Sequence, residues 1–223
     1  MKRNVQIIAA LVVLLALGVW AYTAYQEYSA RKLVLALVKD ASERLRTALG
    51  PQAGTPPDFE LHARTVESHV ATVRKLDASS LRPLADAADG YLVSVREILR
   101  RRTVIQSASE RLPASLDALT THLQTDRGAA AWPQEAVRLK ENLDRDFREY
   151  RIATESYVSL LESLPGAQAK LAPHVDAAWL IDEKIVKDAR AQALDALART
   201  DENIRKVTQL DAYRGRRRQG GTR

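Results

Sequence analysis

The chain has 223 residues, of which 46% are hydrophobic and 28% are charged, a balance that predicts a folded core rather than a disordered chain. It contains no cysteine, which excludes disulfides, thiolate catalysis, cysteine-ligated zinc or iron–sulfur centres and a lipidated cysteine anchor. The net charge of +6 comes from Lys2, Arg3 and the five arginines from Arg214 onward, because the rest of the chain holds 27 basic and 28 acidic residues. The body of the chain therefore has no excess of positive charge that would predict nucleic-acid binding.

The first predicted element is a transmembrane helix over residues 5–25, which read VQIIAALVVLLALGVWAYTAY without a charged side chain. A helix of this length spans about 30 Å, the thickness of a bilayer's hydrocarbon core. Aromatic residues gather at its C-terminal end, where amphipathic rings favour the membrane interface: Trp20, Tyr22, Tyr25 and Tyr28. We therefore expect a single-pass signal anchor, with residues 1–4 as a cytoplasmic N-terminus and the membrane as a partner.

The flanking charges predict the orientation of this span. Lys2 and Arg3 favour an N-terminus inside, although Arg31 and Lys32 weaken the bias. The expected location is a bacterial inner membrane, with the bulk of the chain in the periplasm. The alternative is a cleaved secretory signal, for which residues 19–21 offer a tolerable cleavage site and which would release the protein into the periplasm.

The chain from residue 26 to residue 211 is predicted to be all-α, an elongated antiparallel bundle of four to five helices. The first helix should continue to about Leu49, with its apolar stripe at steps of three and four and with Gly50-Pro51 ending it. The second should run from Asp58, its expected N-cap, to about Lys75. For this second helix the sequence offers a weak stripe that includes Leu61, beside a run of valines.

The remaining three helices are predicted to be long. The third is expected to begin at a Ser79 or Ser80 cap and to reach Thr125, with a kink or break at Pro113. The fourth is expected from Gln134 to Ser163, where Pro165-Gly166 should end it.

The last helix is expected from Val175 to Leu210, with an alanine-rich middle that would let a neighbouring helix approach closely. Residues 212–223 form a basic, glycine-containing tail that we expect to be disordered. The tail could bind anionic lipid or nucleic acid, but we interpret it as a solvated terminus.

Arg102 is the one candidate site residue in the bundle. It falls on the apolar stripe of the third helix, between Ile98 and Ile105. One interpretation is an inward cation that binds an anionic ligand or fixes the register of the bundle. The favoured alternative is a side chain that reaches solvent from the flank or pairs with an acidic residue of a facing helix.

Metal and cofactor sites are not expected. His62 and His69 are seven residues apart, about 10.5 Å along a helix, which is too far to share one metal ion. His122 and His174 are isolated in the sequence. The fourth helix is rich in carboxylates (Glu141, Asp144, Asp146, Glu149 and Glu155), but no Glu-x-x-His pattern of a di-iron bundle occurs, and nearby arginines favour an exposed, ion-paired face.

Trp132 and Trp179 lie near predicted helix ends, where they could form an aromatic end-cap or a ligand pocket; capping the core is the expected role. No P-loop, Rossmann, hydrolase or kinase signature occurs in the sequence, so an enzyme is not expected. The predicted function is that of a membrane-anchored interaction or scaffold protein of the cell envelope, with a protein partner and with homo-oligomers left open. The alternative is a ligand-sensing bundle that works with a separate membrane signalling partner.

Overall fold

The computed structural model describes residues 2–50, 57–76, 79–125 and 132–219, and within these ranges the side chains of residues 2–13, 79 and 210–219 lie outside the description. The described part is all-α. Its five helices are α1 (Lys2–Leu49), α2 (Phe59–Arg74), α3 (Arg82–Gln124), α4 (Trp132–Leu171) and α5 (Glu183–Gln219), with 3-10 turns η1 (Ser79–Leu81), η2 (Ala172–His174) and η3 (Ala177–Trp179). The predicted all-α bundle is confirmed.

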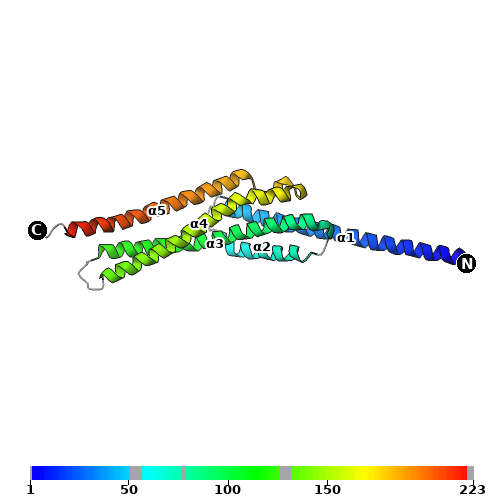
Figure 1. Ribbon diagram of the computed structural model, residues 1–223, viewed down its shortest axis with the longest axis horizontal. Helices are drawn as coiled ribbons and strands as arrows, with labels where there is room; N and C mark the ends of the chain where they lie inside the picture. Colours follow the sequence, from blue (N-terminus) through cyan, green and yellow to red (C-terminus); the bar gives the residue numbers. More distant parts are fainter. Residues whose placement is uncertain (1, 51–56, 77–78, 126–131, 220–223) are drawn as a thin grey trace.

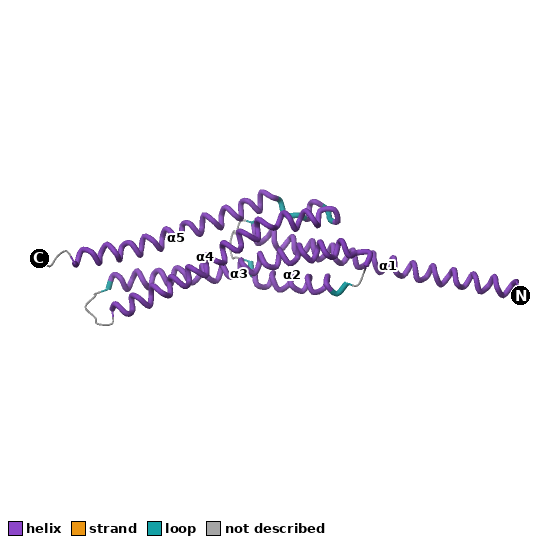
Figure 2. Tube along the Cα trace, viewed as in Figure 1, coloured by secondary structure: helices purple, strands orange, loops and turns teal. Residues whose placement is uncertain are grey.

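The helices alternate in direction along one long axis, so the bundle is antiparallel (Figure 1). α3 packs along both α2 and α4, and α5 returns along α4 (Figure 2). The N-terminal part of α1 projects beyond the body at one end, and the C-terminal end of α3 and the start of α4 lie at the opposite end. At about 1.5 Å per residue, α3 alone is about 65 Å long, which makes the molecule an elongated rod.

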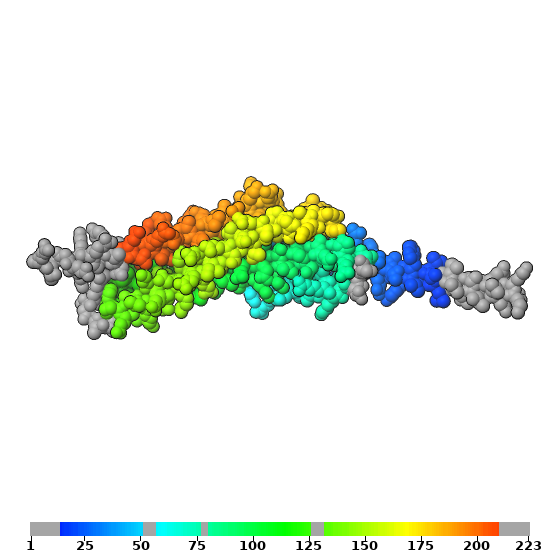
Figure 3. Space-filling model, viewed as in Figure 1, coloured from blue at the N-terminus to red at the C-terminus, as the bar shows by residue number. Residues whose placement is uncertain are grey.

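α1 is one continuous helix with two different parts. Its second half buries a stripe at steps of three and four: Val34, Val38, Ala41, Leu45 and Ala48. All residues from 14 to 29, which we call the N-terminal arm, are exposed, and the arm stands clear of the other helices (Figure 3). Within the residues searched, no helix meets the length and apolarity of a membrane span. The side chains of residues 5–13, the first part of the predicted span, lie outside the described residues.

Two buried clusters hold the bundle together. The first core joins α1, α2, the first half of α3, the end of α4 and the start of α5, around Leu45, Tyr91, Leu92, Ile98 and Leu161. The second core joins the remaining halves of α3, α4 and α5, around Leu112, Leu119, Leu143, Tyr150 and Ile204. α3 and α4 supply most of the second core, whereas the first core draws as many buried residues from α1 and α2 as from α3 and α4.

The buried face of α2 differs from its predicted stripe. Leu61 is exposed, and the valines beside the stripe are buried instead: Val66, Val70 and Val73. Phe59 and Ala63 complete this face. Asp58 caps the helix as predicted, accepting a hydrogen bond from the Leu61 amide at 2.9 Å.

Helix ends show where local signals failed. No serine side chain caps α3; the turn η1 leads into it, and Pro83 occupies its first turn. Pro113 does not break α3, and Pro165 does not end α4, which continues to Leu171. Both prolines are exposed, and buried leucines flank each of them, so tertiary packing holds the helix on both sides of the missing backbone hydrogen bond.

α5 begins at Glu183 rather than Val175, because η2 and η3 take up the intervening residues. The Gln168 side chain fixes this connection: its amide donates to the Ile181 carbonyl at 3.1 Å and accepts from the Ile181 amide at 2.6 Å. Arg46 of α1 donates to the Ala178 carbonyl at 3.0 Å. At its other end α5 is helical to Gln219, past residue 211 where the predicted bundle stops.

Candidate functional site

The N-terminal arm carries the residues expected at a membrane interface. Its large apolar and aromatic side chains are each 56–70% exposed: Leu14, Leu15, Leu17, Val19, Trp20, Tyr22, Tyr25 and Tyr28. Two polar side chains of the arm are bonded within it. Thr23 donates to the Trp20 carbonyl at 2.9 Å, and Gln26 donates to the Tyr22 hydroxyl at 2.6 Å. The arm therefore presents an apolar surface on all sides of one helix.

Arg102 of α3 lies between two aromatic rings inside the bundle. Its guanidinium carbon is 4.9 Å from the centre of the Phe59 ring and 5.6 Å from that of Tyr157. These distances suit cation–π attraction, which steadies a cation without neutralising it. The expected acidic partner is not found: within the described residues no carboxylate pairs with Arg102, and its buried Nε has no hydrogen-bond partner.

The neighbouring arginines of the run behave differently. Arg100 pairs with Glu67 of α2 at 2.9 Å. Arg101 faces a shallow surface depression that Glu97 and Glu155 also line. Arg102 is thus the member of the run that turns toward the interior.

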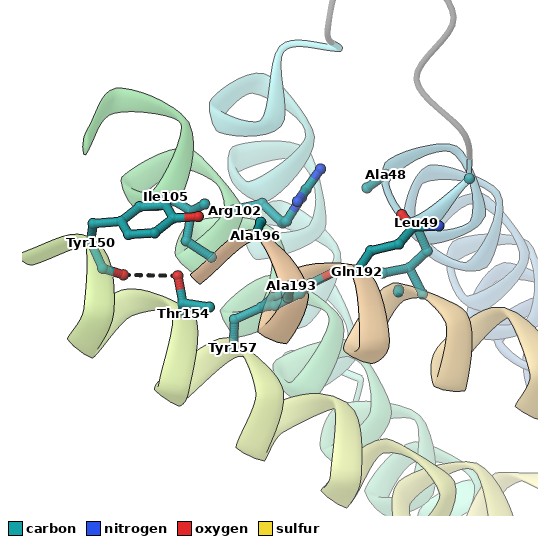
Figure 4. Close-up of a pocket in the computed structure, with 12 residues that line it drawn as sticks. Ala48, Leu49, Arg102, Ile105, Tyr150, Thr154, Tyr157, Gln192, Ala193 and Ala196 are labelled. Carbon is teal, nitrogen blue, oxygen red and sulfur yellow. Dashed lines mark hydrogen bonds between the residues drawn. The ribbon is translucent and has the colours of Figure 1, made fainter. Parts of the chain in front are cut away.

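A cavity of about 280 Å³ lies beside Arg102, at the junction of the two cores. Four helix segments line it (Figure 4). They contribute Ala48, Leu49 and Gly50 from the end of α1, Arg102 and Ile105 from α3, Tyr150, Thr154 and Tyr157 from α4, and Ala189, Gln192, Ala193 and Ala196 from α5. We call this space the Arg102 cavity.

The cavity follows from the sequence around it. α1 ends at Leu49 and α2 begins at Phe59, so neither helix fills the centre of the rod. The alanines of α5 were expected to bring a neighbouring helix close. Their small side chains instead leave space against Tyr150 and Tyr157.

The charge in the Arg102 cavity comes from one cation, Arg102, which lies among mostly apolar groups and has no described anionic partner. Of the described residues that line the cavity, none is acidic and Arg102 alone is charged. Burial raises the pKa of Tyr157 above its ordinary value, although the Arg102 charge opposes this effect, so the phenol stays neutral and can donate a hydrogen bond. Thr154 already donates to the Tyr150 carbonyl at 2.8 Å.

The helix α2 histidines do not form a metal pair. His69 lies 2.7 Å from Asp40, and Arg44 lies 2.6 Å from the same carboxylate oxygen. Burial and the nearby Arg44 charge lower the pKa of His62, whose Nδ1 is buried without a partner. Within the described side chains, no group of three or more His, Asp or Glu residues is placed to hold a metal ion.

One carboxylate of α4 departs from the predicted exposed face. Asp146 is buried and accepts a hydrogen bond from the Ser115 hydroxyl at 2.6 Å, which ties α4 to α3. The other acidic residues of this group are exposed, and Glu149 pairs with Arg111 of α3 at 2.8 Å. The position of Asp146, three residues after Leu143 and four before Tyr150, was the available signal of its burial.

Trp132 covers the end of the second core, as expected of an aromatic cap. Its ring stacks on His122 with centroids 5.0 Å apart, and its indole donates to the His122 carbonyl at 3.2 Å. His122, isolated in the sequence, is thereby joined to the start of α4. Trp179 lies half-buried in η3 and lines no cavity described above.

Sequence reasoning singled out Arg102 but missed its surroundings. Tyr150 and Tyr157 are seven residues apart, which places them on one face of α4, and tyrosines on a face opposite an arginine were a usable signal. The contributions of Leu49 and Phe59 depend on where two helices stop and start in space.

Comparison with family models, with curated proteins and with solved structures found no match.

Proposed function

We propose that this chain is a single-pass, membrane-anchored helical bundle that acts by binding another protein of the cell envelope rather than by catalysis. The observation that carries the proposal is the N-terminal arm. Its apolar side chains are exposed around the whole helix, and no other described segment covers them. Burying them in a bilayer removes this surface from water, at about 25 cal/mol for each Å² of apolar area.

The polar groups of the arm suit the same environment. Thr23 satisfies its hydroxyl on the helix backbone, which is how such residues are tolerated in apolar surroundings. Trp20, Tyr22, Tyr25 and Tyr28 would lie at the outer interface, and Lys2 and Arg3 at the cytoplasmic side. A periplasmic location of the bundle follows from this orientation.

The test is alkaline carbonate extraction of membranes that contain the full chain. The wild type is expected to remain in the membrane pellet. The double substitution L14K/L15K places two charges near the middle of the span, at about 2.5–3.5 kcal/mol each, and should release the protein. L61K is the matched control, because Leu61 is an exposed leucine of α2. Wild-type protein in the carbonate supernatant would refute the anchor.

The shape of the rod supports an interaction role. The C-terminal end of α3 and the start of α4 lie at the end of the rod opposite the arm, so an anchored bundle would carry this end away from the bilayer (Figure 1). Crosslinking in native membranes followed by purification of the full chain should capture the same protein reproducibly. A body that co-purifies only with a small molecule would contradict the interaction role.

One observation favours the second candidate, a ligand-sensing bundle with a separate membrane signalling partner. The Arg102 cavity joins α1, the helix that carries the arm, to α3, α4 and α5. A ligand in the cavity would contact the anchored helix and the body together. Binding that changes the exchange rates of α1 amides would support this candidate.

A further inference from the structure

We propose that the Arg102 cavity binds a small organic monocarboxylate, with its carboxylate on the Arg102 guanidinium and its apolar body against Leu49, Ile105 and the alanines of α5. This site does not depend on the membrane anchor, and either could fail without the other. The proposal rests on three features of the cavity: its single charge, its walls and its size.

The single charge selects the head group. Among the described lining residues Arg102 alone is charged, and no described carboxylate pairs with its guanidinium. Arg102 is half-buried with its Nε buried, and a cation partly removed from water gains from an anion that also satisfies its N–H groups; a guanidinium matches a carboxylate in planar geometry. One positive charge balances a monoanion. A dianion such as a phosphate monoester would bring a second negative charge that no lining residue neutralises.

The walls select the body of the ligand. Most of the lining is aliphatic or aromatic, and its polar groups come from Tyr150, Thr154, Tyr157 and Gln192. An apolar surface with a few placed polar groups is typical of small-molecule sites. A volume of about 280 Å³ lies at the lower end of such sites, so a short aliphatic or single-ring body fits better than a long acyl chain.

The Arg102 side chain is preorganised for binding a carboxylate. The guanidinium lies over the Phe59 and Tyr157 rings, whose cation–π attraction favours this position without occupying its hydrogen-bond donors. The cation is thereby positioned before a ligand arrives, which reduces the entropy lost on binding.

The experiment titrates the full chain in nanodiscs with benzoate and hexanoate, and with benzamide and hexanamide as neutral analogues of the same shape. We expect at least one carboxylate to bind about tenfold or more tightly than its amide. R102Q should remove this preference. R101Q is the matched control, since Arg101 belongs to the same run but faces Glu97 and Glu155, and it should bind like the wild type.

A second variant keeps the proposal testable if R102Q does not fold. A193L leaves Arg102 in place but adds side-chain volume to the cavity, and it should abolish carboxylate binding while circular dichroism stays helical. Inorganic phosphate should bind more weakly than the favoured carboxylate. The proposal is overturned if neither carboxylate binds in the millimolar range, if carboxylate and amide bind alike, if phosphate binds as tightly, or if a folded R102Q or A193L retains wild-type binding.

Discussion

The hydrogen bond between Ser42 and Tyr91 shows how one buried polar pair fixes the position of α1 on α3. The Ser42 hydroxyl donates its only proton to the Val38 carbonyl at 2.9 Å, so the Tyr91 hydroxyl, 2.8 Å away, must be the donor between the two side chains. Both residues are buried. Burial raises the pKa of Tyr91 to about 12, so the phenol keeps its proton at neutral pH and remains a donor.

This assignment predicts an asymmetric response to two substitutions. Y91F removes a donor but leaves the Ser42 proton on Val38, and it should lower the free energy of unfolding by about 1 kcal/mol. S42A leaves the buried Tyr91 hydroxyl without an acceptor and should cost more, up to about 3 kcal/mol. Urea unfolding of both variants measures the difference. Equal losses, or a larger loss for Y91F, would contradict the assigned direction of the bond.

The contact of Asp40 with Arg44 and His69 predicts a pH dependence. Partial burial raises the pKa of Asp40, but the hydrogen bonds and charges of Arg44 and His69 outweigh it and set the pKa below 3.8. A lowered pKa in the folded state stabilises the protein above the unfolded pKa, and this stabilisation is lost as pH falls through the folded value. D40N should therefore cost about 1 kcal/mol or less at pH 7, since the side chain is 39% exposed and screened.

The check is urea unfolding of wild type and D40N at pH 7 and in acid. The difference between the two should shrink as pH falls below 3.8, where the wild-type carboxylate takes up its proton. E43Q is the control, because Glu43 is exposed on the same helix and lies 4.0 Å from Lys39. A difference between wild type and D40N that does not vary with pH would contradict the lowered pKa.

At the scale of the helix, the prolines show when local signals are overridden. Pro113 and Pro165 lack the N–H that would bond the carbonyl four residues earlier, yet both helices continue. Leu112, Leu119 and Leu143 bury their side chains beside Pro113 in the second core. The free energy gained by burying apolar side chains on both sides of the proline exceeds the free energy lost with one hydrogen bond. A local sequence pattern does not show this burial.

This account predicts opposite effects for two proline substitutions. P113A restores the missing hydrogen bond to the Ser109 carbonyl and should raise the free energy of unfolding by about 1–3 kcal/mol. Pro83 lies in the first turn of α3, so P83A gains no backbone hydrogen bond within the helix. The substitution raises the conformational entropy of the unfolded chain and should therefore lower the free energy of unfolding by about 1 kcal/mol or less. Chemical denaturation distinguishes the signs. A loss of stability in P113A would mean that the proline shapes the packing of α3.

Hydrophobic periodicity predicted the features that are set within a single helix, and it failed for features that depend on how two helices are placed relative to each other. The stripes of α3 and α4, the end of α1 and the Asp58 cap follow from spacing and capping chemistry alone. Arg102 was recognised for the same reason, as a cation on an apolar stripe. The cavity beside it, its aromatic partners and the Gln168 clamp on Ile181 require the relative positions of several segments, which no local pattern specifies.

At the scale of the whole molecule, the rod consists of two cores in series. The first core unites five helices and contains most of the fully buried side chains, whereas the second unites the far halves of α3, α4 and α5 and is smaller. Between them lies the Arg102 cavity. Regions with fewer buried apolar contacts open at lower free energy, so the second core should open before the first.

Amide hydrogen exchange of L143A and L92A tests this order of opening. Leu143 is fully buried in the second core and Leu92 in the first, and each truncation should cost about 2–5 kcal/mol. L143A should speed exchange in residues 105–124 and 132–150 while residues 84–99 keep wild-type protection, because the first core retains its contacts with α1 and α2. L92A should speed exchange mainly in residues 84–99, because the second core already exchanges through its own opening of lower free energy. If L143A instead sped exchange equally along the whole rod, the two cores would unfold as one cooperative unit, and the cavity between them would mark no boundary in stability.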